Sequence, residues 1–441
     1  MKIHGLLAAT AAFAVLAGLL YWSDHRKPTA EAANPAEATP AILKLDENSI
    51  TKVDLKKKDG PNILLTKSGA DWKIAEPQPL AADQSTVSGM LSTLSSLNSE
   101  RLVEEKSSDL ERYGLEHPSL EVDVTEKDNK SQRLLLGDDT PTGSAAYAAL
   151  AGDARVFTIA GYHKTSLDKT LNDLRDKRLL TVSPDKVSRL GITGPNGNIE
   201  FGRNKDEWQI LKPTPMRADS DVVGGLVSKL TDARLDLNGS DTAAKESDSA
   251  FAKGSPVAIV KLTDESSTQQ LQIRKSKDLY YAKSSMVDGA YKVNSDLADA
   301  VNKKLEDFRN KKVFDFGYAT PSKLEIHSGS KTYSLMRGGQ DWWDNGRKMD
   351  EDSVSSLISN LRDLSADKFV ESGFTTPEFE ATITDNDGKK IEKVLISKSG
   401  SNYIAQRDRD PALYQLTSTS VDELQKSFDG IKPAIPAKSG K

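Results

Sequence analysis

The sequence predicts an α+β fold made of three tandem copies of one mixed unit, placed behind a single N-terminal transmembrane helix. Three observations carry this prediction. Tryptophans recur at Trp72, Trp208 and Trp342, which lie 136 and 134 residues apart. Apolar residues fall at the same offsets around each of these tryptophans. A 20-residue apolar stretch without formal charge, residues 3–22, precedes all three copies.

The apolar stretch is long enough to cross a bilayer, because 20 residues of helix span roughly 30 Å. Tyr21 and Trp22 lie at its outer end, where amphipathic rings favour the membrane interface. Ala30–Ala32 has the form of a signal-peptide cleavage site but lies about ten residues past the apolar run. We therefore expect an uncleaved anchor over residues 1–27, rather than a cleaved signal peptide. Residues 28–41 are rich in Pro, Ala and Glu and should form a linker.

The first half of each copy predicts strands followed by a helix. Two segments that alternate apolar and polar residues precede each Trp and are joined by turn residues. After the Trp strand comes an aspartate, which we interpret as a helix N-cap, with apolar residues at +4, +8 and +11. The sets are Asp83 with Val87, Leu91 and Leu94; Asp219 with Val223, Val227 and Leu230; and Asp350 with Val354, Ile358 and Leu361.

The second half of each copy starts after a proline, at Pro118, Pro256 and Pro377. Apolar residues at +2, +4 and +6 predict a half-buried strand there, and further strands follow. A closing helix is expected near 163–177, 296–309 and 418–428. Each unit therefore reads β-β-β-α-β-β-β-β-α and should be largely antiparallel. The predicted boundaries are 42–180, 181–314 and 315–432 for the copies, with a disordered tail at 433–441.

The composition and the motifs exclude several classes of chemistry. The net charge of −5 argues against a nucleic-acid binder. The chain has no cysteine, which excludes disulfides, thiolate metal sites and cysteine nucleophiles. His117, His163 and His327 show no metal-ligand spacing. The sequence therefore predicts no cofactor, no metal and no catalytic residue, and it singles out no binding residue.

Two charged features have simple structural interpretations. The acidic pair Asp138–Asp139 is expected in a hairpin turn. The basic clusters at 175–178 and 309–312 are expected at helix C-termini, where positive charge complements the helix dipole. The alternative for these clusters is contact with an anionic lipid or polymer.

The repeated Trp also has two interpretations. A Trp at the same place in every copy is typical of a core or hairpin-edge residue, which we favour. The alternative is a stacking platform for carbohydrate.

The string from Trp72 to Leu180 contains W-K-I-A-E-P, A-D-Q-S-T-V, Y-G-L-E-H-P, L-L-L-G-D and R-D-K-R-L-L. It resembles the uncharacterised bacterial family catalogued as domain of unknown function 4340. The resemblance extends over residues 42–430, although the second and third copies lack the Tyr-Gly-Leu element. Members of that family are often membrane-anchored and are associated with gene neighbourhoods of gliding-type ABC transporters. The resemblance implies an envelope accessory role and supplies no catalytic residues.

The sequence thus leads us to expect a non-enzymatic accessory or scaffold protein of an envelope transport or assembly complex. It should sit in the bacterial inner membrane as a single-pass protein through residues 3–22, with its body in the periplasm. The expected partner is an envelope membrane complex, which the family resemblance suggests is an ABC-type transporter. The alternatives are a binder of envelope glycan or polymer, or a hydrolase with a site outside the known motifs.

Overall fold

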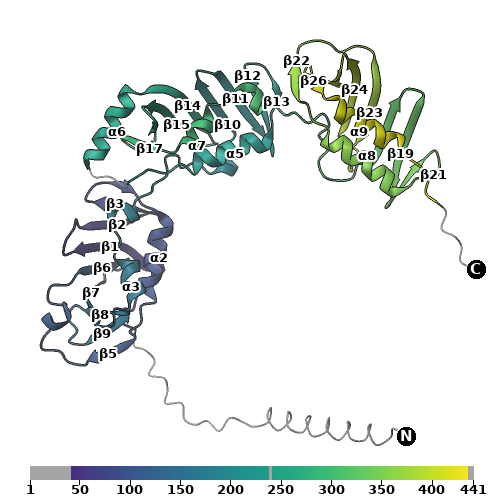
Figure 1. Ribbon diagram of the computed structural model, residues 1–441. Helices are drawn as coiled ribbons and strands as arrows, with labels where there is room; N and C mark the ends of the chain where they lie inside the picture. Colours follow the sequence, from purple (N-terminus) through teal and green to yellow (C-terminus); the bar gives the residue numbers. More distant parts are fainter. Residues whose placement is uncertain (1–40, 238–240, 436–441) are drawn as a thin grey trace, which may run out of the picture. The chain divides into compact units, whose positions relative to one another are not determined.

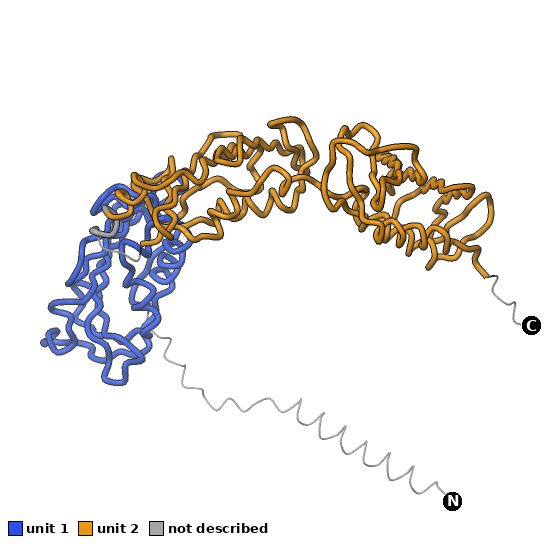
Figure 2. Tube along the Cα trace, turned by 45° about the horizontal axis from the view of Figure 1, so that its top comes forward, with its two compact units in different colours: residues 1–177 blue, residues 178–441 orange. Residues whose placement is uncertain are grey.

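The computed structural model describes residues 41–237 and 241–435 (Figure 1). The predicted anchor at 3–22 lies outside the described residues, as do residues 28–40 of the predicted linker at 28–41 and residues 436–441 of the predicted tail at 433–441; in that tail Pro433 pairs with Met349 and Ala434 donates to Lys348. Within the described ranges, no helix is long and apolar enough to cross a membrane. The chain divides into two compact units, Met1–Lys177 and Arg178–Lys441 (Figure 2). One sheet lies in the first unit, and two sheets lie in the second.

The fold is α+β and mostly β-sheet, and all strand pairs are antiparallel in the three sheets. The strand orders are β4-β3-β2-β1-β6-β7-β8-β9-β5, β13-β12-β11-β10-β14-β15-β16-β17 and β21-β20-β19-β18-β23-β24-β25-β26-β22. In each sheet the first strand of the early half pairs with the first strand of the late half. These central pairs are β1 with β6, β10 with β14 and β18 with β23. The helices that follow the Trp strand and the helices that close each set cover the core face of their sheet (Figure 1), whereas α6 packs on the opposite face of the second sheet, where Phe251 meets Arg274 and Lys283.

The first sheet and its helices comprise η1 (Glu47–Ser49), β1 (Ile50–Lys57), β2 (Ile63–Ser68), β3 (Asp71–Glu76), β4 (Leu80–Ala81), α2 (Gln84–Ser95), β5 (Arg101–Glu104), η2 (Glu111–Tyr113), β6 (Leu120–Glu126), β7 (Ser131–Asp139), β8 (Ala145–Leu150), β9 (Val156–Ala160), α3 (Gly161–Leu167) and α4 (Leu171–Leu174).

The second sheet and its helices comprise η3 (Pro184–Lys186), β10 (Arg189–Gly194), β11 (Gly197–Asn204), β12 (Glu207–Lys212), β13 (Met216–Arg217), α5 (Ser220–Thr231), α6 (Asp241–Lys253), β14 (Ser255–Thr263), β15 (Thr268–Ser276), β16 (Leu279–Ser284), β17 (Ala290–Val293), α7 (Ser295–Val301) and η4 (Leu305–Phe308).

The third sheet and its helices comprise β18 (Lys323–Ser328), β19 (Lys331–Gly338), β20 (Asp341–Asp344), β21 (Arg347–Lys348), α8 (Glu351–Asp363), β22 (Lys368–Val370), β23 (Pro377–Thr384), β24 (Ile391–Ser399), β25 (Asn402–Arg407), β26 (Leu413–Leu416) and α9 (Ser418–Asp429).

The first helix of each set forms as predicted. The side chains of Asp83, Asp219 and Asp350 cap α2, α5 and α8 by accepting hydrogen bonds from backbone N–H groups of the first turn. The residues predicted at +4, +8 and +11 are all buried against the sheets. Each capping aspartate also donates its own N–H to a carbonyl at the end of the closing helical segment, at Leu174, Phe308 and Lys432. This hydrogen bond joins the early and late halves of each of the three repeats.

The closing segment differs from the single helix that the sequence predicts for the first two copies. A capping box at Thr170 and Asp173 starts a new short helix, so α3 and α4 are separate. In the second set, α7 ends at Val301 and η4 follows. Only α9 is one continuous helix.

Several elements were not predicted. The two-residue strands β4, β13 and β21 follow each Trp strand, and β5 and β22 add an edge to the first and third sheets. Helix α6 occupies the corresponding stretch of chain in the second set. These segments lack a clear alternation of apolar residues, which explains why the sequence pattern did not predict them.

Candidate functional site

The chain passes from the second sheet to the third through a segment that is hydrogen-bonded along its length. The N–H of Asn310 donates to the carbonyl of Arg217 at 3.0 Å, on the side of the second sheet. One residue later, the carbonyl of Lys311 accepts from Ala366 at 2.8 Å, on the side of the third sheet. The N–H of Val313 then donates to Leu364 at 2.9 Å. Residues 309–313, here called the linking segment, are therefore bridged by backbone hydrogen bonds to both parts of the chain.

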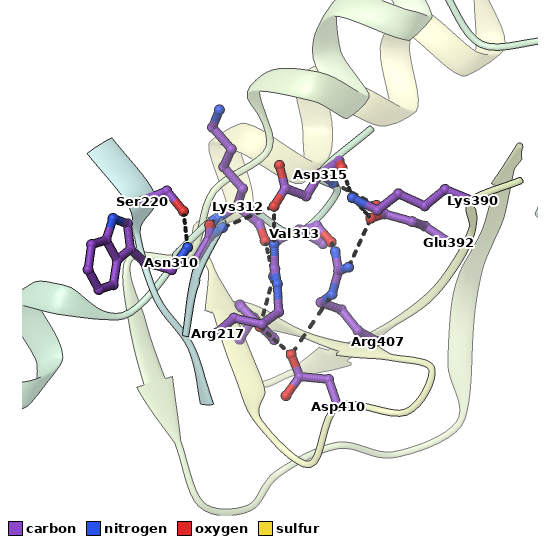
Figure 3. Close-up of polar contacts among 12 residues, drawn as sticks. Arg217, Ser220, Asn310, Lys312, Val313, Asp315, Lys390, Glu392, Arg407 and Asp410 are labelled. Carbon is purple, nitrogen blue, oxygen red and sulfur yellow. Dashed lines mark hydrogen bonds and ion pairs between the residues drawn. The ribbon is translucent and has the colours of Figure 1, made fainter. Parts of the chain in front are cut away.

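A charged cluster surrounds this linking segment (Figure 3). Arg217, on β13, donates to the carbonyl of Lys312 at 2.8 Å and to the Tyr414 hydroxyl at 3.1 Å. Its other terminal nitrogen binds the Asp315 carboxylate at 2.9 Å. Asn310 donates to the same carboxylate oxygen at 3.1 Å. A single guanidinium from the second sheet therefore engages backbone, hydroxyl and carboxylate groups of the third.

A second arginine completes the cluster from within the third sheet. Arg407, on β25, donates to the carbonyl of Val313 and to the Glu392 carboxylate, the latter at 3.2 Å. The other oxygen of Glu392 accepts from the N–H of Asp315 at 2.6 Å. The Glu392 and Arg407 side chains are 5% and 11% exposed, so this ion pair is buried. Burying such a pair is costly unless each charge is compensated, and here both are.

The cluster shifts the titration of its members. Burial disfavours the charged form of Asp315, but the Arg217 guanidinium outweighs burial and lowers the pKa of this carboxyl below its usual value. Burial raises the pKa of the Tyr414 phenol to about 12; the Arg217 guanidinium opposes this rise, and the hydrogen bond to the Asp410 carboxylate adds to it. The Tyr414 hydroxyl donates to Asp410 at 2.7 Å. Tyr414 therefore stays neutral and Asp315 stays ionised at neutral pH.

The lowered pKa of Asp315 predicts that the junction weakens in acid. The unfolded carboxyl titrates near 3.8 and the folded one below that value, so the stabilisation is present above about pH 4 and is lost as the pH falls through the folded pKa. We expect Asp315→Asn to lower the free energy of unfolding by about 1–2 kcal/mol at pH 7. Denaturant unfolding from pH 7 to pH 2.5 measures this difference, which should shrink toward zero at the acid end. A difference that does not change with pH would contradict the assignment.

The position of Glu392 has an equivalent in every sheet, which the sequence pattern did not reveal. Gln132, Gln269 and Glu392 lie opposite Val124, Leu262 and Ile383 in the corresponding strand pairs. The side-chain oxygens of Gln269 and Glu392 accept from the backbone N–H of the residue entering the sheet, Thr181 at 2.8 Å and Asp315 at 2.6 Å. In the first sheet Gln132 donates to the carbonyl of Lys44 at 2.8 Å. In each sheet one side chain thus binds the backbone of the segment that leads into the sheet. This side chain is a neutral glutamine in the first two sheets and the glutamate Glu392 in the third.

The basic cluster at 309–312 begins at the C-cap of η4, so its predicted place at a helix C-terminus is confirmed, and the chain is extended from Arg309 on. Arg309 has an extended backbone and its guanidinium lies 3.4 Å from the ring centroid of Phe369, on β22 of the third sheet. This is a cation–π contact across the junction. Arg175 likewise has an extended backbone and pairs with Ala82. Both arginines are therefore C-cap residues of short helical segments, and Arg309 in addition contacts the third sheet.

The three repeated tryptophans are core residues, as the favoured interpretation predicted. Trp72, Trp208 and Trp342 are 5%, 5% and 2% exposed. Their faces are covered by the hydrophobic cores of their own sheets. They are therefore not available as a carbohydrate-stacking platform.

The Tyr-Gly-Leu and Leu-Gly-Asp elements of the first copy contact each other. A Cβ on Gly137 would lie 2.1 Å from the carbonyl oxygen of Tyr113, and one on Gly114 would lie 2.7 Å from the Asp138 side chain. Gly114 also has a φ of 67°, which favours glycine. Asp138 and Asp139 belong to strand β7, so the expected hairpin turn is wrong; the chain turns after Asp139. These motif residues serve close backbone packing.

Nothing in the described part of the chain groups three His, Asp or Glu side chains as a metal site would. His117, His163 and His327 lie in separate places, and burial lowers the pKa of His163. His327 shares a hydrogen bond with Thr332 at 2.9 Å.

The comparisons with known proteins identify one family. Its model, described as a domain of unknown function, matches residues 72–215 and again residues 208–382. Each match starts at a core tryptophan, on β3 or β12, and runs through the rest of that sheet into the next one, ending just before β13 or within β23, so both include an inter-sheet segment. No curated protein and no solved structure gave a significant match. Because the two matches together cover most of the sequence, the chain belongs to the family Domain of unknown function (DUF4340).

Proposed function

We propose that this protein is a non-enzymatic scaffold or accessory subunit of an envelope transport or assembly complex. In this proposal residues 3–22 anchor it in the bacterial inner membrane, and three tandem repeats form its extracytoplasmic body. Tandem repeats of one fold offer extended surfaces to partners. The similar strand order of the three sheets supports the repeat. The equivalent side chains Gln132, Gln269 and Glu392, each bound to the backbone of the segment that enters its sheet, support it as well.

The junction between the second and third sheets is the observation that carries the proposal. Its ionised side chains are satisfied by one another and by backbone groups, and they fix the passage of the chain from one sheet to the next. Buried charge networks of this kind hold a defined geometry, because breaking them leaves an uncompensated charge. A scaffold needs such fixed spacing between its binding surfaces. Both family matches also include an inter-sheet segment, which makes the passage between sheets part of what the family shares.

Cross-linking in intact cells tests the proposal. We expect the full-length chain to be cross-linked to one or a few membrane proteins, identified by mass spectrometry. A matched control joins residues 1–41 to an unrelated soluble domain, so that contacts made by the anchor alone are recognised. The proposal fails when no membrane protein is recovered, or when the control recovers the same proteins in the same yield.

A further inference from the structure

A cavity of about 500 Å³ opens at one end of the third sheet, beside helix α9 and the turn between β18 and β19. Its walls include the side chains of Phe379, Ile396 and Val421, which are buried, and that of the half-buried Tyr403. This volume lies within the range of pockets that bind small ligands or single side chains of a partner. The apolar walls suit an aliphatic chain rather than a wholly polar group.

The mouth of this cavity carries negative charge. Glu378 and Asp422 both line it, both are exposed, and neither forms an ion pair with any cation among the described residues. A third polar group, Gln425, is already engaged, since its amide oxygen accepts from Ser328 at 2.8 Å and its amide nitrogen donates to Asp429 at 3.1 Å. Two carboxylates are therefore left to meet an incoming group, and their charge favours a cation.

In the first sheet a lysine holds the helical position that Val421 holds in α9. Counting from the N-cap residues Ala160 and Thr417, Lys164 stands at the same helical position as Val421. The Lys164 side chain is only 18% exposed, and its ammonium donates to the carbonyl of Gly137 at 3.0 Å and to Asp139 at 2.8 Å. A lysine of the chain itself thus lies between the closing helix and this end of the sheet. In the third sheet the shorter Val421 leaves room.

We propose that this cavity binds a lysine side chain of a partner protein. The methylene stem packs against Phe379, Tyr403 and Val421, and the ammonium reaches the carboxylates of Glu378 and Asp422. Long basic side chains commonly bury their stem while the charged end stays at the surface. The inference rests on the proposed function, because it names the chemistry by which the scaffold would hold its partner.

Binding of the peptide acetyl-Ala-Lys-Ala-amide to the full-length chain tests this inference. We expect saturable binding by ligand-observed NMR, and an affinity at least about tenfold weaker for the norleucine analogue, which keeps the stem but lacks the ammonium. The double variant Glu378→Gln/Asp422→Asn should weaken lysine-peptide binding by a similar factor. The matched control is Glu371→Gln/Asp299→Asn, which removes the same total charge; Asp299 stands in α7 where Asp422 stands in α9. This control should bind within twofold of the native chain.

Three outcomes overturn the inference: no saturable binding, equal affinity for the norleucine peptide, or equal weakening in both double variants. Val421→Lys supplies an independent reading, because a lysine placed as in the first sheet should fill the cavity and abolish peptide binding. Binding of the peptide without any membrane partner in cells would contradict the scaffold proposal alone. Recovery of a partner without peptide binding would contradict only the lysine site.

Discussion

Replacing Arg217 with alanine should lower the free energy of unfolding by about 2–4 kcal/mol. The Arg217 side chain is 23% exposed, and its guanidinium contacts Lys312, Asp315 and Tyr414. Its loss leaves the Asp315 carboxylate facing only weaker donors and removes a donor from the tyrosine hydroxyl. Arg217 belongs to the second sheet, whereas its acceptors Lys312, Asp315 and Tyr414 belong to the third sheet and the chain that leads into it. Its loss should therefore weaken the connection between the second and third sheets. Hydrogen exchange of the full-length chain should therefore rise first in residues 309–316.

The third sheet supplies a matched control for Arg217→Ala, namely Lys348→Ala. Lys348 lies opposite Trp343 on β21, as Arg217 lies opposite Gln209 on β13. Lys348 is exposed and its ion pair with Asp341 is a surface pair, so Lys348→Ala should cost no more than about 0.5 kcal/mol. Arg217→Lys should fall between the two, because an ammonium keeps the charge but cannot reach all three acceptors. Equal losses in Arg217→Ala and Lys348→Ala would show that the cluster does not couple the sheets.

The sequence predicts well those helices and strands in which apolar residues recur every two to four positions. Val87, Leu91 and Leu94 recur on one helical face, and an aspartate capable of capping precedes them, so both the extent and the buried side of α2 follow from local spacing. The same holds for the strands entered near each proline. The split between α3 and α4 was also open to local inference, since Thr170 and Asp173 have capping-box spacing.

The junction could not be predicted in that way, because its partners are distant in sequence. Arg217 and Tyr414 are 197 positions apart, and Asp315 and Glu392 are 77 apart. A polar residue on a strand, such as Gln269 or Glu392, has the pattern of a solvent-facing side chain. That such a residue binds the backbone of the segment entering the sheet is visible only in the folded structure. Comparing polar residues at equal register in the three copies would have found the Gln, Gln, Glu series.

The second large loss of folding stability is expected when Gly137 is replaced. A Cβ there would lie 2.1 Å from the Tyr113 carbonyl oxygen and 3.2 Å from a methyl group of Leu115. The nearest atom belongs to the backbone, so it cannot rotate away as a flexible side chain would. Relief requires β7 to move from η2, and this would disturb the bonds that Ser119 and Lys164 make to the Gly137 carbonyl at 3.2 and 3.0 Å.

We therefore expect Gly137→Ala to lower the free energy of unfolding of the first unit by about 2–4 kcal/mol. Gly89→Ala is the matched control, because a Cβ at this exposed position of α2 meets no atom within 4 Å. Alanine is the better helix former, so this control should gain about 0.5–1 kcal/mol. Hydrogen exchange should show the loss within residues 41–177, with native protection kept in the second and third sheets. Equal stability of the two variants would mean that the contact between the Tyr-Gly-Leu and Leu-Gly-Asp elements yields easily, and that these motifs owe their presence to something other than packing.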